Sequence, residues 1–300
     1  MKSVQILLST YNGERFLAEQ MDSLLAQDHR PLDILVRDDG SKDGTLAILD
    51  RYSRLPNVQV VSATNVGAAK SFLELVRMSS DQSDYFALCD QDDVWLPHKI
   101  SRAVAVLEDM PAQRPLLYAS RLSIVDDALR PLLLSKVPAH APTLGNALVE
   151  TCLTGCTMVF SRAARDLLVA GMPNYVLMHD TWIYLVLAAL GDIRYDPEPT
   201  ILYRQHAANT IGVGPAGVTH WIWRARRFLK RERGYTEQVQ EFDRLFGNQL
   251  RPEQHRLVDL VLNARSSFSA RVRLAGSREV FRQVPINDLL MRLVMLANRL

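Results

Sequence analysis

The fold of this chain is decided by residues 85–95, YFALCDQDDVW. A short apolar run that ends abruptly at polar residues is typical of a buried β-strand. Three carboxylates, from Asp90, Asp92 and Asp93, follow that run directly, and burying them unpaired would cost free energy. A divalent cation relieves their repulsion, because ions such as Mg²⁺ bind carboxylate and phosphate oxygens. The alternative interpretation is a solvated turn that caps the helix beginning near Pro97.

Outward from this stretch, the first two thirds of the chain alternate short apolar runs with amphipathic segments. That alternation predicts β-α-β units, and therefore an α/β fold with a mainly parallel sheet. The predicted strands are 4–9, 34–37, 58–61, 85–89, 116–124, 157–160 and 200–203. The predicted helices are 13–27, 45–52, 66–78, 179–190 and one that begins near residue 97.

Polar clusters follow the carboxyl ends of four predicted strands. These clusters are Thr10-Tyr11-Asn12, Asp38-Asp39, Asn65 and Asp90-Gln91-Asp92-Asp93. In an open α/β sheet, ligands bind at this edge, at the topological switch point. We therefore expect the four clusters to form one site, and this convergence favours a cation over a solvated turn.

Two other motifs have competing interpretations. The loop that begins at Asp39 and reaches Asp50 matches the spacing of an EF-hand, but a β-like run precedes it and its twelfth position is Asp rather than Glu. Asp39 is better suited to accept hydrogen bonds from a nucleotide base or ribose. Residues 212–217, GVGPAG, match a dinucleotide fingerprint, but no clear strand leads into them and Pro215 interrupts them. A hinge loop is the favoured interpretation there.

An apolar helix is predicted to begin at His179-Asp180. Asp180 is either a helix cap or a general base that takes a proton from an attacking hydroxyl. Residues 203–206, YRQH, follow the last predicted strand. Arg204 and His206, beside a carboxylate cluster, are candidates for binding a diphosphate and its metal.

Composition excludes several classes of protein. With 48% apolar and 23% charged residues over 300 positions, the chain is not globally disordered. No apolar run approaches the roughly 18 to 20 residues that cross a bilayer, and no signal-peptide pattern opens the sequence, so an uncleaved cytoplasmic chain is expected. Three cysteines, Cys89, Cys152 and Cys156, are too few for a disulfide framework or a four-cysteine zinc site.

Charge divides the chain unevenly. Residues 215–300 carry 16 Lys and Arg against 8 Asp and Glu, whereas residues 1–214 carry 19 against 25. A basic tail indicates a polyanionic partner, either nucleic acid or an anionic membrane surface. Trp221–Arg231 and Ile286–Leu300 have the mixture of cations and apolar side chains found in interfacial helices. The alternative is that these helices pack on the rest of the chain and expose a solvated basic face.

Five motifs occur in order along the chain: residues 9–13 STYNG, 37–41 RDDGS, 65–67 NVG, 90–95 DQDDVW and 179–180 HD. Together they resemble the motifs of inverting glycosyltransferase family 2. The resemblance spans residues 1–210 and implies the Rossmann-like GT-A fold, a mixed, mostly parallel sheet flanked by helices. It implies a catalytic domain at 1–211, with a nucleotide and metal half at 1–110 and an acceptor half at 111–211. A helical basic region would occupy 212–300.

The resemblance also assigns roles to residues. Asp180 matches the catalytic base and Asp92 the principal metal ligand, with His206 completing the metal or diphosphate shell. The residues assigned to the nucleotide-sugar are Thr10, Tyr11, Asn12, Asp39, Asn65, Lys70, Asp90, Gln91 and Arg204. The candidate acceptor contacts are Trp95, His179 and Trp182.

The activity implied is the inverting transfer of a single sugar, with Mg²⁺ or Mn²⁺ as cofactor, from a nucleotide-diphosphosugar to a saccharide acceptor. The DQDDVW and YRQH motifs are most similar to those of bacterial rhamnosyltransferases of lipopolysaccharide core or O-antigen. This similarity implies dTDP-L-rhamnose as donor, a lipid-linked acceptor and peripheral association with the inner membrane. A donor such as a UDP-hexose is the alternative within this class.

Two alternatives from outside this class are weaker. A nucleic-acid-binding protein acting through the basic tail would be expected to carry a zinc-finger spacing, an RNP-like aromatic pattern or a recognition helix, and the sequence has none of these. We therefore expect no nucleic-acid partner. A nucleotidyltransferase has the same metal and nucleotide requirements, but it makes the activated sugar rather than consuming it.

Overall fold

The computed structural model describes residues 1–111, 113–205 and 234–298. Its strands are β1 Val4–Thr10, β2 Leu32–Asp38, β3 Val58–Ser62, β4 Tyr85–Cys89, β5 Val94–Trp95, β6 Leu116–Val125, β7 Pro131–Leu134, β8 Val159–Ser161 and β9 Asp192–Arg204. In this part of the chain they form a single nine-stranded sheet in the order β3-β2-β1-β4-β8-β6-β9-β5, with β7 paired to β6 outside this path.

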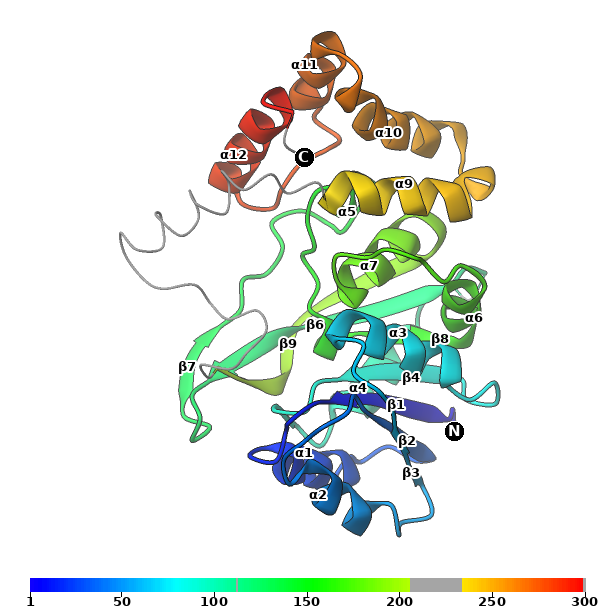
Figure 1. Cartoon of the computed structure of the whole chain (residues 1–300), viewed down its shortest axis with the longest axis vertical. Helices are drawn as coiled ribbons and strands as arrows, with labels where there is room; N and C mark the ends of the chain where they lie inside the picture. Colours follow the sequence, from blue (N-terminus) through cyan, green and yellow to red (C-terminus); the bar gives the residue numbers. More distant parts are fainter. Residues whose placement is uncertain (112, 206–233, 299–300) are drawn as a thin grey trace.

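Helices lie on both faces of the sheet (Figure 1). The α-helices are α1 Leu17–Leu25, α2 Thr45–Tyr52, α3 Ala68–Met78, α4 Lys99–Glu108, α5 Leu144–Ala147, α6 Arg162–Ala170, α7 His179–Leu190, α9 Gly234–Phe246, α10 Pro252–Leu262, α11 Phe268–Gly276 and α12 Pro285–Leu296. The short 3-10 turns are η1 Gly155–Thr157, η2 Gly247–Gln249 and η3 Asn263–Arg265. The predicted mixed sheet flanked by helices is therefore confirmed.

Strand register brings the predicted polar clusters to one edge. β1 is parallel to both β2 and β4, with Leu8 opposite Val36 on one side and Cys89 on the other. Thr10 lies opposite Asp38 at the carboxyl end of the pair. Because all three strands run in the same direction, the loops that follow them leave from the same edge.

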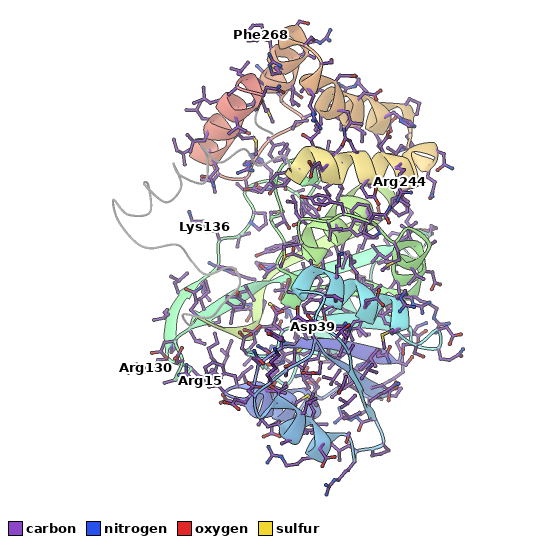
Figure 2. All side chains as sticks on the ribbon, in the orientation of Figure 1. Arg15, Asp39, Arg130, Lys136, Arg244 and Phe268 are labelled. Carbon is purple, nitrogen blue, oxygen red and sulfur yellow. The ribbon has the colours of Figure 1, made fainter. Side chains whose placement is uncertain are left out.

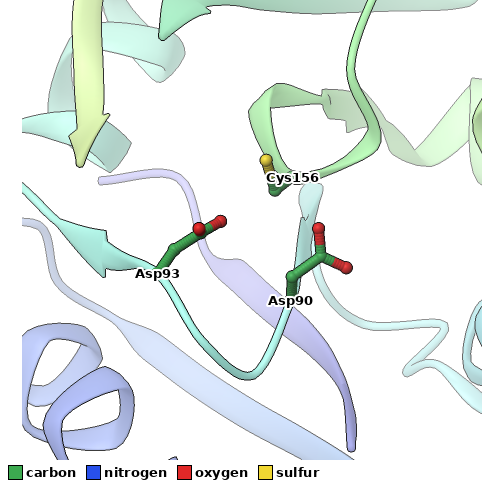
Figure 3. Close-up of side chains that lie close together, drawn as sticks. All are labelled: Asp90, Asp93 and Cys156. Atoms are coloured by element: carbon green, nitrogen blue, oxygen red, sulfur yellow. The ribbon is translucent and has the colours of Figure 1, made fainter. Parts of the chain in front are cut away.

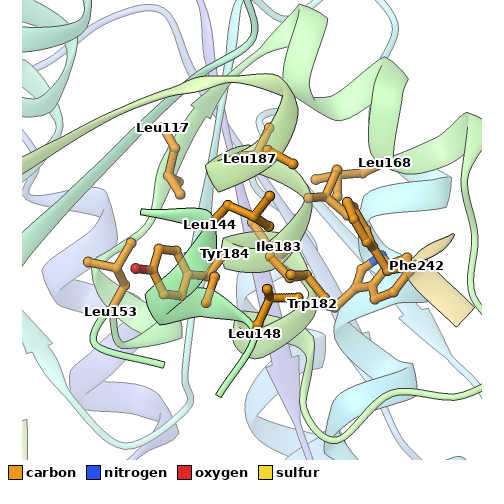
Figure 4. Close-up of a cluster of buried hydrophobic side chains, with 14 of the residues drawn as sticks. Leu117, Leu144, Leu148, Leu153, Leu168, Trp182, Ile183, Tyr184, Leu187 and Phe242 are labelled. Atoms are coloured by element: carbon orange, nitrogen blue, oxygen red, sulfur yellow. The ribbon is translucent and has the colours of Figure 1, made fainter. Parts of the chain in front are cut away.

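Two hydrophobic cores fill the two faces of the sheet, because successive strand residues point to opposite sides. Ile6 and Leu8 face α1, α2 and α4, whereas Leu7 and Leu88 face α3, α6 and α7. Figure 4 shows the second core, in which Trp182 of α7 packs among leucines from several elements. Its ring centroid lies 6.4 Å from that of Phe242 in α9.

The C-terminal helices extend this second core instead of standing apart from it. Phe242 and Phe246 of α9 contact Trp182 of α7. The Gln254 side chain of α10 donates a hydrogen bond of 2.6 Å to the carbonyl oxygen of Ala189. α9 and α10 therefore pack on the sheet domain. The expected boundary at residue 211 lies outside the described residues.

Several predicted elements differ in the structure. Four strand pairs are parallel and four antiparallel, so the described sheet is less parallel than predicted. The first helix begins at Leu17 rather than residue 13, because Asn12 has a φ of 48° and residues 13–16 form a turn. The last strand begins at Asp192 rather than residue 200, and register shifts accommodate its two prolines. β5, β7, α5 and α6 were not among the predicted elements.

A glycine contact tests how tightly the C-terminal helices dock. A Cβ atom on Gly145 of α5 would lie 1.9 Å from the carbonyl oxygen of Glu279, whose backbone cannot easily retreat. We predict that Gly145→Ala lowers the free energy of unfolding by about 1–3 kcal/mol. Gly276→Ala is the matched control, because nothing lies within 4 Å of a Cβ at that position. Urea denaturation of both variants measures the difference, and equal midpoints would contradict the close packing.

Candidate active site at the carboxyl edge of the sheet

The turn that follows β4 holds an acidic cluster. Asp90 and Asp93 each place a carboxylate oxygen, and Cys156 of η1 its sulfur, so that all three atoms lie within 4.8 Å of one another (Figure 3). Asp93 is fully buried, whereas Asp90 and Asp92 are half-buried. Asp90 and Cys156 are 66 positions apart in the sequence. They meet because β8, the strand after η1, pairs with β4.

The cluster carries strong like-charge repulsion. Burial, and then the charges of Asp92 and Asp180, raise the pKa of Asp90 to about 7. Burial, and then the charges of Asp90 and Asp92, raise the pKa of Asp93 well above its ordinary value. Asp180, at the start of α7, lies on the same side of η1: its Cβ would be 3.4 Å from a Cβ on Gly155, the neighbour of Cys156. The start of α7 and the acidic turn therefore meet at η1.

The residues of this cluster fit a hard divalent cation. Asp90 and Asp92 offer two half-buried carboxylates, the number that Mg²⁺ or Mn²⁺ takes from a protein when substrate oxygens complete its shell. Burial and the charges of Asp93 and Asp90 raise the pKa of the Cys156 thiol well above its ordinary value. Mg²⁺ and Mn²⁺ prefer oxygen ligands to sulfur, so Cys156 acts as a hydrogen-bonding neighbour of the carboxylates rather than as a ligand.

Gln91 ties the acidic turn to the loop after β1. Its Oε1 accepts hydrogen bonds from the Thr10 hydroxyl at 2.6 Å and the Tyr11 backbone N–H at 2.8 Å. A Cβ on Gly13 would lie 2.4 Å from the same oxygen, so the approach requires a glycine there. Thr10 is buried, while Tyr11 and Asn12 are exposed. Gln91 and Thr10, expected to contact the donor, are hydrogen-bonded to each other.

Asp39 is buried and its carboxylate is occupied by the protein. It accepts hydrogen bonds from Arg37 at 2.5 Å and from the backbone N–H groups of Val66 and Gly67, both at 2.9 Å. Gly67 has a φ of 82°, a conformation that favours glycine. Asp39 therefore fixes the loop before α3. Figure 2 shows Asp39 near the centre of the molecule. This loop carries Asn65, which is exposed.

Arg204 does not face a substrate, which corrects the expectation that it binds the donor. Its side chain is 2% exposed and stacks on the Phe16 ring, 4.3 Å from the ring centroid. Its guanidinium donates to the carbonyl oxygens of Asp92 and Asp127 and to the carboxylate of Glu19. Its backbone N–H donates to Asp93 at 3.1 Å. Arg204 therefore positions the acidic turn.

The first turn of α7 presents Asp180 to the site. One Asp180 oxygen accepts the Thr181 backbone N–H at 2.7 Å, and the helix is capped at Met178, not by Asp180. His179 stacks on Phe72, with ring centroids 4.0 Å apart, and burial lowers its pKa. A Cβ on Gly155 would lie 2.5 Å from the His179 ring, so this glycine lets α7 approach η1 closely.

The two tryptophans expected to contact the acceptor are core residues instead. Trp182 is fully buried under α9, and Trp95 is 2% exposed. The ammonium group of Lys99 lies 3.9 Å from the Trp95 ring centroid. Burial lowers the pKa of Lys99 to about 8. Neither ring presents a surface to a saccharide, because helices cover both of them.

Three buried polar residues around this site had no predicted role. Arg37 clamps Asp39, Cys156 approaches the aspartates, and Lys99 lies behind them. Lys99 lies on the apolar face of α4 with Ile100 and Ala103. A lysine within an apolar stripe of the sequence could have indicated that it is buried. His206, the tail at 221–231 and the GVGPAG motif all lie outside the described residues. Lys70 of α3 is exposed.

Comparison with known proteins places the chain in a family. A family model described as Glycosyl transferase family 2 matches residues 5–164. The dTDP-rhamnosyl transferase RfbG of Shigella flexneri is 28% identical over 253 residues, which cover 77% of this chain and 82% of the relative.

Two solved structures share the fold and confirm the GT-A architecture. S. aureus TarS 1–349 in complex with UDP-GlcNAc has a TM-score of 0.58 and 16% identity, covering 99% of this chain and 91% of that one. The mannosyltransferase PcManGT from Pyrobaculum calidifontis, in complex with GDP-Man and Mn²⁺, has a TM-score of 0.53 and 18% identity, covering 98% of this chain and 85% of that one. Within the described residues, every helix is too short or too polar to traverse a bilayer.

The positioning role of Arg204 is testable through stability alone. We predict that Arg204→Met lowers the free energy of unfolding by about 3 kcal/mol, because buried acceptors lose their donor. The control is Arg130→Met, which removes an exposed pair with Asp126 and should cost less than about 1 kcal/mol. Urea denaturation without ligands compares the two variants. A similar, small loss of unfolding free energy in both variants would contradict the positioning role of Arg204.

Proposed function

The chain belongs to glycosyl transferase family 2, and from this premise we propose that it transfers one sugar, with inversion, from a nucleotide-diphosphosugar to a saccharide acceptor. The observation that carries the proposal is that Asp180 packs beside Gly155 of η1, while the next residue, Cys156, lies against Asp90 and Asp93 at the end of β4. One site then contains Asp180, the base for the acceptor, and Asp90 and Asp92, the carboxylates for a cation-bound diphosphate. Transfer between two bound substrates requires that proximity.

Asp180 acts as the general base in this proposal. Its carboxylate takes the proton of an acceptor hydroxyl, whose oxygen attacks the anomeric carbon while the bond to the nucleoside diphosphate breaks on the opposite face. One oxygen of Asp180 is held by the Thr181 N–H, which fixes the orientation of the carboxylate. His179, locked between Phe72 and Gly155, holds the start of α7 in place. These contacts position the base before substrate arrives.

Asp90 and Asp92 would hold a divalent cation, Mg²⁺ or Mn²⁺, which when bound neutralises charge on the diphosphate. Gln91 and Arg204 keep the turn that carries these two aspartates in place. Asn65 and Lys70, both exposed beside the loop that Asp39 fixes, line the donor site in this proposal. The exposed Tyr11 and Asn12 contact the base and ribose.

The proposed donor is dTDP-L-rhamnose and the proposed acceptor a lipid-linked saccharide of bacterial lipopolysaccharide or surface polysaccharide. The support is the similarity to RfbG together with the DQDDVW and YRQH motifs. A UDP-hexose is the alternative donor. A thermal-shift screen of dTDP-, UDP- and GDP-sugars with Mg²⁺ or Mn²⁺ separates the donors, because a ligand stabilises only the state that binds it.

Replacing the base tests the reaction chemistry. We predict that Asp180→Asn retains donor binding but lowers the rate of transfer by about 10²–10⁴-fold, because the amide cannot accept the proton. Asp50→Asn, on the exposed face of α2, is the control and should leave transfer unchanged. Calorimetry measures donor affinity, and release of nucleoside diphosphate measures turnover. Turnover by Asp180→Asn at the rate of the control would remove Asp180 from this role.

Replacing a carboxylate of the turn tests the cation site. We predict that Mg²⁺ or Mn²⁺ strengthens binding of the nucleoside diphosphate by the natural chain, and that Asp92→Asn loses at least about tenfold of that affinity. Without added cation the two proteins should bind the nucleotide equally weakly. Calorimetric titrations with and without the cation give both comparisons. Cation-independent affinity in the natural chain would contradict the assignment of Asp92.

A further inference from the structure

An apolar stripe runs along the solvent side of α12. The helix buries Met291 and Met295 against the core, as an amphipathic helix does. Its outer side nevertheless exposes Ile286, Leu289 and Leu293, at 43%, 55% and 49% of their surface. The spacing of three and four residues places these side chains in one line. The exposed stripe of α12 is therefore apolar.

A second apolar patch lies on β7. Leu132, Leu133 and Leu134 are 56%, 53% and 45% exposed, and Val137 just beyond them is 45% exposed. Leu132 and Leu134 share one face of β7, and Leu133 points to the other, because successive strand residues alternate. Single apolar side chains on a protein surface are ordinary, whereas neighbouring exposed leucines form a patch. Leu132, Leu134 and the α12 stripe are together called the apolar face below.

Both patches lie on the side of the molecule where the catalytic edge opens. β1 begins at the N-terminus on the right of Figure 1, so its carboxyl end points left, toward the side where β7 and α12 lie. The β6–β7 turn is also linked to the acidic turn through Arg204. Asp127 in that turn pairs with Arg15 at 2.6 Å, and its carbonyl oxygen accepts from Arg204, which holds the acidic turn.

Cations accompany the apolar face. Arg273 of α11 and Arg278 just after it are exposed, whereas Arg292 of α12 is held by Asp288 and by backbone carbonyl oxygens. Arg130 precedes β7 and Lys136 follows it, both exposed on the same side of the molecule (Figure 2). Leucines beside cations match the chemistry of an anionic bilayer surface, in which acyl chains receive apolar side chains and headgroups attract the charges.

We propose that the apolar face docks on an anionic lipid bilayer and turns the catalytic edge toward it. The proposal deepens the proposed function, since a lipid-linked acceptor would then present its saccharide to Asp180 from the membrane surface. It assigns membrane contact to β7 and α12, which come from different parts of the sequence. Two separated contacts fix an orientation, whereas one amphipathic helix alone leaves the enzyme free to pivot.

Vesicle sedimentation with the full chain tests the proposal without donor or acceptor. The natural chain should bind phosphatidylcholine vesicles containing phosphatidylglycerol, and should bind pure phosphatidylcholine vesicles about tenfold less. The double variants Leu289→Gln with Leu293→Gln, and Leu132→Thr with Leu134→Thr, should each weaken binding to the anionic vesicles by about tenfold or more. Unchanged circular dichroism melting would show that both variants fold.

Met78→Gln is the matched control. Met78 is 36% exposed at the end of α3, and the nearby Ser80 N–H donates to Gln5 at the start of β1, which places Met78 at the opposite edge of the sheet. This variant should bind vesicles like the natural chain. Natural-chain binding that both double variants retain, or no binding to anionic vesicles, would overturn the proposal. So would leucine-dependent dimerisation, seen by ultracentrifugation, with vesicle binding unaffected.

Failure of this inference is distinguishable from failure of the proposed function. Transfer to a water-soluble saccharide acceptor is measured without vesicles, and the leucine variants should perform it at the natural rate. If soluble transfer occurs but vesicles do not bind, the apolar face is not a membrane contact and the enzymatic proposal stands. If vesicles bind but neither donor binding nor transfer occurs, the enzymatic proposal fails and the docking surface stands.

Discussion

Repulsion among carboxylates at the end of one buried strand is the constraint on which this structure depends. Asp90, Asp92 and Asp93 leave β4 within four positions, and Asp180 approaches them from α7. The protein does not disperse these charges. It surrounds them with groups that hold the turn in place: Gln91 from within, Arg204 from β9, and the Cys156 thiol from η1. A pre-formed acidic site of this kind is suited to a cation and a diphosphate.

Support for the site comes from elements that are distant in sequence but adjacent at the edge of the sheet. Arg204 connects the acidic turn with α1 through Glu19 and with the β6–β7 turn through Asp127. Arg37 and Asp39 do the same for the loop before α3. Buried charged groups with several hydrogen bonds are rigid, because breaking any one leaves an unpaired charge. Positioning, more than direct contact, is what these residues contribute.

The C-terminal helices connect this catalytic edge to the rest of the molecule. α9 covers Trp182 in the first turn of α7, the same turn that carries His179 and Asp180, so core packing beside Asp180 steadies its position. α12 continues the layer and buries its methionines, yet leaves leucines exposed. The helical region thus stabilises the fold on its inner side and carries a surface for interaction on its outer side.

The sequence alone determined the alternation of strands and helices, the acidic turn and the clustering of polar residues at one edge. These follow from local rules, because apolar periodicity and strand direction are properties of short segments. The sequence did not determine the roles of Trp182, Trp95, Arg204 or Gln91. Whether a side chain meets a ligand or another part of the chain depends on what packs over it, and only the tertiary structure places α9 over Trp182 or the β6–β7 turn over Arg204.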